Sequence, residues 1–154
     1  MSLPMVEVLS PVAGRRQEVS DVPDPVFARG LVGPGAAIAP HPGLQAAVAP
    51  IDGRVVKLHP HAYVIVSDRG PGVLVHLGID TVQLHGDGFT PLVPEQADVR
   101  AGDEIVSWDP GFVERTGRSA ICAVVVLDCP FPATALSDSG TEVGSAEPLF
   151  AIDC

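Results

Sequence analysis

Residues 61–77 read His61-Ala62-Tyr63-Val64-Ile65-Val66-Ser67-Asp68-Arg69-Gly70-Pro71-Gly72-Val73-Leu74-Val75-His76-Leu77. Two apolar, β-branched runs, 63–66 and 73–77, flank a segment rich in Asp, Gly and Pro, which is the pattern of two strands joined by a turn. Because both runs are continuous rather than alternating, we expect strands that are buried on both faces and central in a sheet. Neighbouring antiparallel strands would bring His61 and His76 face to face. The segment therefore predicts a two-histidine site.

Similar short runs recur along the chain and predict further strands at 6–9, 36–39, 54–58, 63–67, 73–77, 81–84, 104–107 and 121–127. The 16 Gly and 16 Pro residues interrupt the sequence too often for long helices. Hydrophobic residues make up 46% of the chain but aromatic residues only 5%, so the core must consist of Val, Leu, Ile and Ala. We expect an all-β fold, an antiparallel β-sandwich or flattened barrel of the barrel-sandwich hybrid type.

Two short helical turns interrupt this pattern. Asp24 precedes a turn at Pro25–Arg29 and Asp109 precedes one at Pro110–Arg115, which combines a capping residue with proline at the first helical position. Residues 130–147 are rich in Ser, Thr and Gly and are expected to form a loop. The length fits one domain over residues 1–154, in which Met1-Ser2-Leu3 are of possible cloning origin.

The composition excludes several classes of protein. A net charge of −10 with Lys57 as the single lysine excludes a nucleic-acid-binding surface and favours basic protein partners. The three cysteines, Cys122, Cys129 and Cys154, form no C-x-x-C pair, which predicts reduced thiols and no disulfide framework or structural zinc site. No run approaches the roughly 20 apolar residues of a membrane span, and no secretory signal pattern is present. We expect a soluble, cytoplasmic protein.

Several motifs share one order and spacing with a known family. They are Asp24-Pro25-Val26-Phe27-Ala28, Gly33-Pro34-Gly35-Ala36-Ala37-Ile38-Ala39-Pro40, Ala49-Pro50-Ile51-Asp52-Gly53, His61-Ala62-Tyr63, His76-Leu77-Gly78-Ile79-Asp80-Thr81-Val82 and Gly86-Asp87-Gly88-Phe89. Each motif alone is weak, but the set is specific. From Pro11 to about Phe150, the chain resembles the glucose-family enzyme IIA of the bacterial phosphoenolpyruvate:sugar phosphotransferase system.

The resemblance implies that His76 accepts a phosphoryl group from the phosphocarrier HPr and passes it to a cysteine on a sugar-specific IIB domain. The equivalent of His61 supports this transfer in the family. The chemistry agrees, because neutral imidazole is a nucleophile near pH 7 and phosphoryl transfer depends on alignment and charge stabilisation. We expect His61 to donate a ring N–H to the phosphoryl oxygens while an acceptor holds its other nitrogen. No cofactor and no metal are expected.

The same resemblance implies a partner-binding surface around the histidines. Its members are two acids that grip arginine on HPr and five apolar residues that dock against it: Asp24, Asp80, Val26, Phe27, Leu31, Val32 and Leu74. An apolar collar excludes water from the transfer while charges at its rim set orientation. The simpler interpretation is that Asp24 caps a helix and Asp80 a turn, and both interpretations can hold together. Regulated transporters or metabolic enzymes are further partners that the family has.

The chain departs from the family just before the supporting histidine. Where the family commonly has a threonine whose hydroxyl joins the hydrogen-bond network, this chain has His59, and Pro60 follows. Two alternatives remain open. His59 either offers a donor in place of the hydroxyl or points to solvent and leaves His61 oriented by the backbone alone.

Two other functions compete with the carrier hypothesis. Lipoyl and biotinyl carriers modify a lysine in a tight hairpin, usually between two methionines, but Lys57 lies within a strand-like run and Met1 and Met5 are far along the chain. Metal binding through His61 and His76 would need a third ligand, which only His59 or Asp80 could supply.

Overall fold

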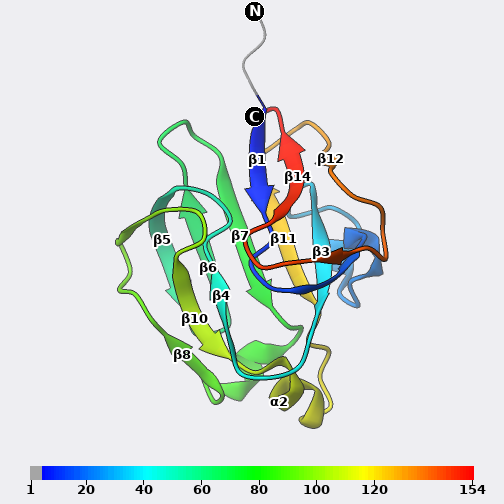
Figure 1. Cartoon of the computed structure of the whole chain (residues 1–154), viewed down its shortest axis with the longest axis vertical. Helices are drawn as coiled ribbons and strands as arrows, with labels where there is room; N and C mark the ends of the chain where they lie inside the picture. Colours follow the sequence, from blue (N-terminus) through cyan, green and yellow to red (C-terminus); the bar gives the residue numbers. More distant parts are fainter. Residues whose placement is uncertain (1–4) are drawn as a thin grey trace, which may run out of the picture.

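Short strands separated by tight turns make up most of residues 5–154, which a computed structural model describes (Figure 1). The prediction for Met1-Ser2-Leu3 lies outside the described residues. The strands are β1 (Val6–Leu9), β2 (Gly14–Gln17), β3 (Gly35–Pro40), β4 (Gln45–Val48), β5 (Gly53–His59), β6 (Ala62–Val66), β7 (Gly72–Leu77), β8 (Phe89–Pro91), β9 (Asp98–Val99), β10 (Glu104–Trp108), β11 (Cys122–Leu127), β12 (Thr134–Ala135), β13 (Glu142–Val143) and β14 (Pro148–Ile152). The helices are α1 (Pro25–Ala28), α2 (Pro110–Arg115) and the 3-10 turns η1 (Val19–Asp21) and η2 (Thr81–Leu84).

The strands of the described residues form three sheets. The largest has the order β13-β2-β3-β11-β7-β6-β5-β9, and the two smaller ones have the orders β4-β10-β8 and β1-β14-β12. Every strand pair is antiparallel. The expected all-β antiparallel sandwich with short helical turns is therefore confirmed. The hairpin predicted from residues 61–77 is β6–β7, at the centre of the large sheet.

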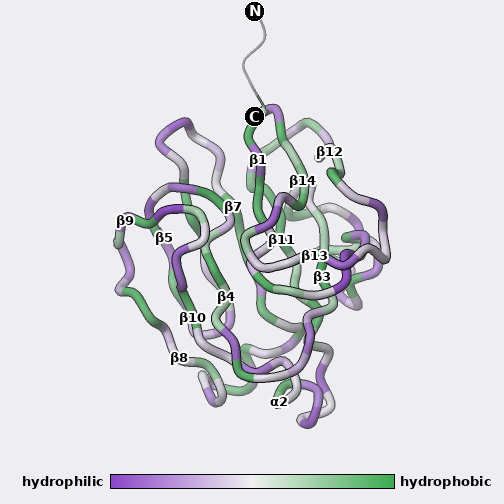
Figure 2. Tube along the Cα trace, viewed as in Figure 1, coloured by the Kyte–Doolittle hydropathy of each residue, from purple (hydrophilic) through white to green (hydrophobic). Residues whose placement is uncertain are grey.

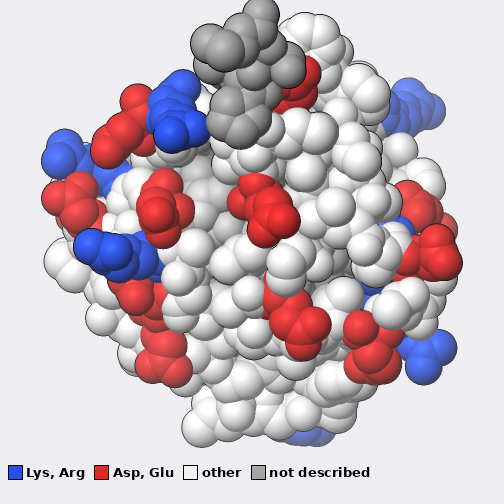
Figure 3. Space-filling model, turned by 45° about the horizontal axis from the view of Figure 1, so that its top comes forward, with Lys and Arg blue, Asp and Glu red and all other residues white. Residues whose placement is uncertain are grey.

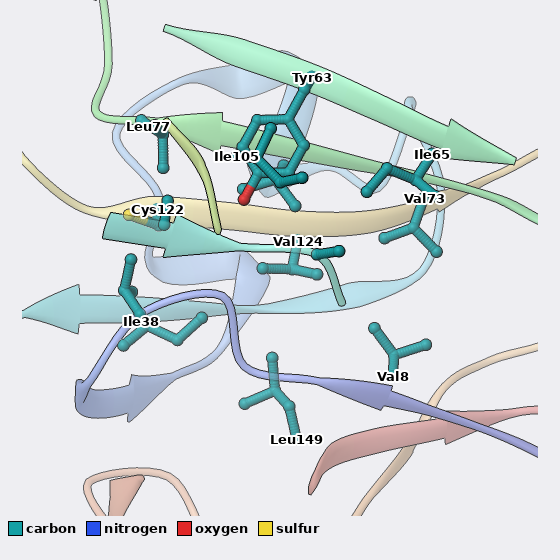
Figure 4. Packing of buried hydrophobic residues seen from close by; sticks show 14 of the residues in the cluster. Val8, Ile38, Tyr63, Ile65, Val73, Leu77, Ile105, Cys122, Val124 and Leu149 are labelled. Carbon is teal, nitrogen blue, oxygen red and sulfur yellow. The ribbon is translucent and has the colours of Figure 1, made fainter. Parts of the chain in front are cut away.

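The main core lies between the sheets. Figure 4 shows Val8 and Leu149 on the far side of this core from Tyr63 and Ile65, and all four side chains are buried. Figure 2 shows the matching pattern along the chain, with hydrophobic residues along the inner strands and hydrophilic residues at the turns. The hydroxyl of Tyr63, the one tyrosine of the chain, donates a hydrogen bond of 2.7 Å to the Val48 carbonyl, so this buried polar group has a partner.

The outer face of the large sheet carries a second, smaller apolar cluster. In β7 the side chains alternate, so that Val73, Val75 and Leu77 are fully buried in the main core while Leu74 and His76 are half-buried on the other face. The expected burial on both faces thus holds only in part. The segment containing η1 and α1, drawn in blue beside β3 in Figure 1, covers this outer face. The cluster contains Val22, Phe27, Ala37, Ile79, Ala123 and Val125.

Two predictions of secondary structure differ from the structure. Residues 81–84 were expected to be a strand but form η2, because Asp80 adopts a left-handed conformation with φ 60° that ends the extended chain. The Thr81 hydroxyl then bonds the Leu77 carbonyl at 2.8 Å. Residues 130–147 contain β12 and β13, two-residue strands whose local sequence carries no apolar run. The sequence also did not indicate β2, β4, β8, β9 or β14.

The prediction of three free thiols is wrong. Cys129 and Cys154 form a disulfide whose Cα atoms are 5.9 Å apart, and Cys122 alone is a free, buried cysteine. Cys129 follows β11 and Cys154 follows β14, so the pairing depends on how the fold places two strand ends that are 25 residues apart. No short spacing motif signals such a pair.

Charged side chains of both signs lie on the face nearest the chain termini (Figure 3), where carboxylates and arginines are interspersed. This face therefore has a mixed charge. Neither α1 nor α2, with 4 and 6 residues, has the length and apolar composition that crossing a membrane requires, and residues 5–154 contain no other candidate helix.

Candidate functional site: a pair of facing histidines

The structure brings His61 and His76 together at one end of the β6–β7 hairpin. His76 lies near the end of β7 and faces Ala62 in the register, and His61 immediately precedes Ala62 in the tight turn from β5. The Leu77 amide also donates to the His61 carbonyl at 2.8 Å, which extends the ladder past the strand end. The ring centroids of the two histidines are 5.2 Å apart with an interplanar angle of 72°.

A backbone carbonyl defines the tautomer of His76. Its Nδ1 atom lies 2.6 Å from the carbonyl oxygen of Gly78. A carbonyl oxygen can only accept a hydrogen bond, so Nδ1 must carry the proton. In the neutral ring, the lone pair is then on Nε2. The nucleophilic atom of His76 is therefore Nε2.

The chain around Gly78 is held by local hydrogen bonds. Gly78 has φ +78°, a conformation that glycine adopts without strain. The Ile79 amide donates to the Ser119 carbonyl at 2.9 Å, and the Thr81 hydroxyl donates to the Leu77 carbonyl. These bonds tie both sides of Gly78 to the rest of the fold, so its carbonyl oxygen is a fixed acceptor for His76.

Burial keeps both rings neutral near pH 7. It lowers the pKa of His61 from 6.5 to about 4, with repulsion from His76 and His59 as further causes. Burial also lowers the pKa of His76 below 6.5, while the Gly78 carbonyl and the carboxylates of Asp24 and Asp80 act in the opposite direction. Both predicted acids thus lie close enough to act on His76 electrostatically. A neutral ring is the form that can attack phosphorus.

The predicted apolar residues differ in their burial. Phe27 is 7% exposed, and its ring centroid lies 5.3 Å from that of His76. Val32 and Leu74 are half-buried against the same outer-face cluster. In contrast, Val26 and Leu31 are 48% and 70% exposed. The predicted set thus combines side chains that pack on the outer face of the sheet with side chains that are exposed.

Asp24 has a structural role as well as a place in the site. Its side chain accepts a hydrogen bond of 2.9 Å from the Val26 amide and caps α1. Asp80 precedes η2 but makes no side-chain capping bond. The simpler interpretation of Asp24 as a cap is therefore correct, and it is compatible with the electrostatic effect on His76. For Asp80 the expected capping bond is absent.

Sequence reasoning did not single out two features close in the chain to Asp80 and His76. Val82, in η2 just after Asp80, is 59% exposed and belongs with Val26 and Leu31 among the exposed apolar side chains. The Gly78 carbonyl was not foreseen as the partner of His76, although a glycine two residues after the histidine was the available signal. In addition, the acceptor expected for the second nitrogen of His61 is not found, because its ring makes no hydrogen bond within residues 5–154.

The competing sites find little support in the structure. Lys57 lies within β5 opposite Val64 and not at a hairpin tip, unlike the modified lysine of a lipoyl or biotinyl carrier. Within residues 5–154, no group of three or more His, Cys, Asp or Glu side chains is arranged to hold a metal ion.

Comparisons with known proteins agree with this geometry. The mannose-specific EIIBCA component of the phosphotransferase system from Corynebacterium glutamicum is 41% identical over 124 residues, which are 79% of this chain and 18% of that protein. The glucose-specific EIIA component from Staphylococcus aureus is 37% identical over 125 residues, covering 80% of this chain and 74% of that protein. The chain thus spans less than a fifth of the EIIBCA relative but most of the EIIA relative.

A solved structure extends the similarity to nearly the whole chain. The glucose permease IIA from Mycoplasma capricolum has a TM-score of 0.87 at 29% sequence identity, and the match covers 97% of this chain and 96% of that one. The family model for the EIIA 1 component of the phosphoenolpyruvate-dependent sugar phosphotransferase system matches residues 6–129. This protein belongs to the EIIA 1 family of the phosphoenolpyruvate-dependent sugar phosphotransferase system.

Proposed function

We propose that this protein is a phosphoryl carrier in which His76 accepts a phosphoryl group from phospho-HPr and passes it to a cysteine on a sugar-specific IIB domain. The observation that carries the proposal is the pair of rings 5.2 Å apart, with Nδ1 of His76 bound to the Gly78 carbonyl and Nε2 free. Family membership supports the same activity.

The transfer conserves charge and needs no proton to leave the site. The lone pair of Nε2 attacks phosphorus, an N–P bond forms, and the bond between phosphorus and the donor atom of HPr breaks. Nδ1–H stays bonded to the Gly78 carbonyl and stabilises the ring as it gains positive character. In the second step, a thiolate of the IIB domain attacks phosphorus, and the N–P bond breaks to return neutral His76.

His61 stabilises the phosphoryl group during both steps. Its depressed pKa, about 4, keeps the ring neutral near pH 7, so one nitrogen carries a hydrogen that can be donated to a phosphoryl oxygen. A donor that is already in place requires no reorganisation when charge develops, which is the usual origin of such catalysis. The ring is half-buried and therefore reachable from the surface.

The surface around the pair serves as the docking site for both protein partners. Exposed Val26 and Leu31 contact the partner and exclude water, while Asp24 and Asp80 attract its basic side chains. A IIB partner is supported by the names of the corynebacterial relatives, in which a region similar to this chain is part of an EIIBCA component. The exchange we propose takes place on the cytoplasmic side of the membrane and requires no cofactor.

Phosphorylation with enzyme I, HPr and phosphoenolpyruvate tests the proposal. The wild-type protein is expected to gain one phosphoryl group by mass spectrometry, in an acid-labile and alkali-stable adduct, and His76→Ala is expected to gain none. His41→Ala is the matched control, because His41 is exposed and contacts Glu142 rather than the site. Normal labelling of the His76→Ala protein would refute the assignment.

A further inference from the structure

A third imidazole continues the row formed by His76 and His61. His59 ends β5, and its ring centroid lies 5.8 Å from that of His61 with an interplanar angle of 26°. The His61 ring thus has two aromatic neighbours, the His76 ring in an edge-on arrangement and the His59 ring in a stacked one. Both separations fall within the range of favourable pairs of aromatic rings.

The turn between β5 and β6 produces this row. His59 pairs with Ala62 across the hairpin, and Pro60 and His61 form the turn between them. Pro60 restricts the backbone, because its ring fixes φ. Pro60 thus limits the backbone between the two histidines, whose rings stack in the structure.

The His61 ring has few contacts, and His59 is one of them. Within residues 5–154 no hydrogen bond reaches either nitrogen of this ring, and its aromatic neighbours are His59 and His76. The His76 ring is itself held by the Gly78 carbonyl and by Phe27. The His59 ring is thus the aromatic neighbour of His61 other than the phosphoryl acceptor itself. Repulsion from His59 is also among the causes that lower the pKa of His61, so the two rings are close electrostatically.

We propose that His59 is a positioning residue for phosphoryl transfer, whose ring stacks on that of His61 and holds its N–H toward the phosphoryl group on His76. This inference rests on the proposed function. Its relation to the two alternatives left open by the sequence is mixed. The His59 side chain is exposed, as the second alternative has it, but its ring also stacks on the His61 ring.

Three variants separate stacking from other effects. His59→Ala removes the ring, His59→Phe keeps an aromatic face but no nitrogen, and His41→Ala removes an exposed histidine elsewhere. Onward transfer from each phosphorylated protein is measured with the isolated IIB domain of the Corynebacterium glutamicum mannose-specific EIIBCA component. We expect transfer by His59→Ala to be about fivefold slower at saturating IIB, with an unchanged KM for the IIB domain, because stacking of this strength corresponds to a factor of that order. His59→Phe should stay within about twofold of wild type.

A spectroscopic measurement reports on His61 without any partner. In ¹³C,¹⁵N-labelled protein, the couplings that report the χ1 angle of His61 are expected to shift toward values averaged over several rotamers in His59→Ala, and to keep wild-type values in His59→Phe and His41→Ala. Wild-type spectra and rates in His59→Ala would overturn the proposal, as would a His59→Phe protein as slow as His59→Ala. If the wild type accepts no phosphate from phospho-HPr, the proposed function fails, and the His61 spectra still decide whether His59 positions the ring.

Discussion

The Nδ1 atom of His76 lies 2.6 Å from the carbonyl oxygen of Gly78, two residues later in the chain. This single bond assigns the ring proton to Nδ1 and leaves Nε2 as the nucleophile. It exists because the backbone turns sharply at Gly78, where φ is +78°. The orientation of the nucleophile therefore depends on a backbone conformation that favours glycine.

Replacing Gly78 by alanine should damage both stability and phosphorylation. A Cβ atom at Gly78 would lie 2.7 Å from Cγ2 of Thr81 and 3.0 Å from the Ser119 carbonyl oxygen, in addition to the strain of a left-handed residue. We expect Gly78→Ala to lower the free energy of unfolding by about 2–3 kcal/mol. Because the carbonyl must move, phosphorylation by phospho-HPr should also slow. Urea denaturation and the initial rate of labelling measure the two effects.

Gly117 provides the matched control for this experiment. It has φ +85°, but a Cβ atom there would meet nothing within 4 Å. Gly117→Ala should therefore show only the backbone strain, about 1 kcal/mol, and normal labelling. Equal effects of the two substitutions would show that contacts around Gly78 do not matter.

Stability should fall as the pH decreases from about 6.5 to about 4. His61 has a folded-state pKa of about 4 against an ordinary 6.5, and the pKa of His76 is shifted in the same direction, so the unfolded chain binds protons that the folded protein does not. For His61, the loss of stability begins near the pKa of the unfolded chain, 6.5, and is complete below the pKa of the folded protein, about 4. For half-exposed His61, we expect about 1 kcal/mol after allowance for solvent screening.

The contribution of His61 is isolated by comparing wild type with His61→Gln in urea at several pH values. The difference in free energy of unfolding between the two proteins should change by about 1 kcal/mol between pH 6.5 and 4, because carboxylates titrate equally in both. A constant difference over that range would contradict a depressed pKa at His61.

Elements whose signals lie in residues adjacent in the sequence could be predicted. The β6–β7 hairpin follows from its apolar runs and Gly-Pro turn, and α1 and α2 follow from Asp24 and Asp109 with proline after each. The segment 81–84 could not be predicted in this way, since its residues suit a strand. The left-handed conformation of Asp80 favours the 3-10 turn η2 over a strand. This backbone conformation is seen only in the folded structure.

The same distinction applies to the site: some of its features follow from local motifs and others only from the folded chain. The motifs that contain His61 and His76 identified both rings, and the hairpin register explains why they meet. The stack of His59 on His61 and the pairing of Cys129 with Cys154 depend on distances in the folded chain, which residue spacing does not report.

The disulfide should stabilise the protein under oxidising conditions. It closes a loop of about 25 residues that contains β12, β13 and β14. Loop closure of this length contributes about 3 kcal/mol by restricting the unfolded chain. Cys154→Ser should lose this amount in urea denaturation without reductant, and wild type should match the variant once dithiothreitol is added. Identical denaturation curves without reductant would argue against the bond.

Leu31 should contribute to partner binding without contributing to stability. Its side chain is 70% exposed, so Leu31→Ala should change the free energy of unfolding by less than about 0.5 kcal/mol. If the exposed apolar residues dock against HPr, the KM for phospho-HPr should rise about fivefold, which corresponds to about 1 kcal/mol. Leu44, 80% exposed in the turn between β3 and β4, is the control, and an equal rise in Leu44→Ala would show that the effect is not local.

His61→Gln should separate acceptance of the phosphoryl group from its onward transfer. Nε2 of His76 remains available in this variant, because Nδ1 is held by Gly78 and not by His61. The adduct should therefore reach the normal level once labelling is complete, although its rate of formation falls. Passage to the IIB domain should slow by about 100-fold, as is typical when one prepositioned donor to a developing charge is removed. His41→Gln makes the same chemical change at an exposed histidine and should transfer normally. Onward transfer at the wild-type rate in His61→Gln would mean that the second ring, although 5.2 Å from the first, takes no part in the reaction.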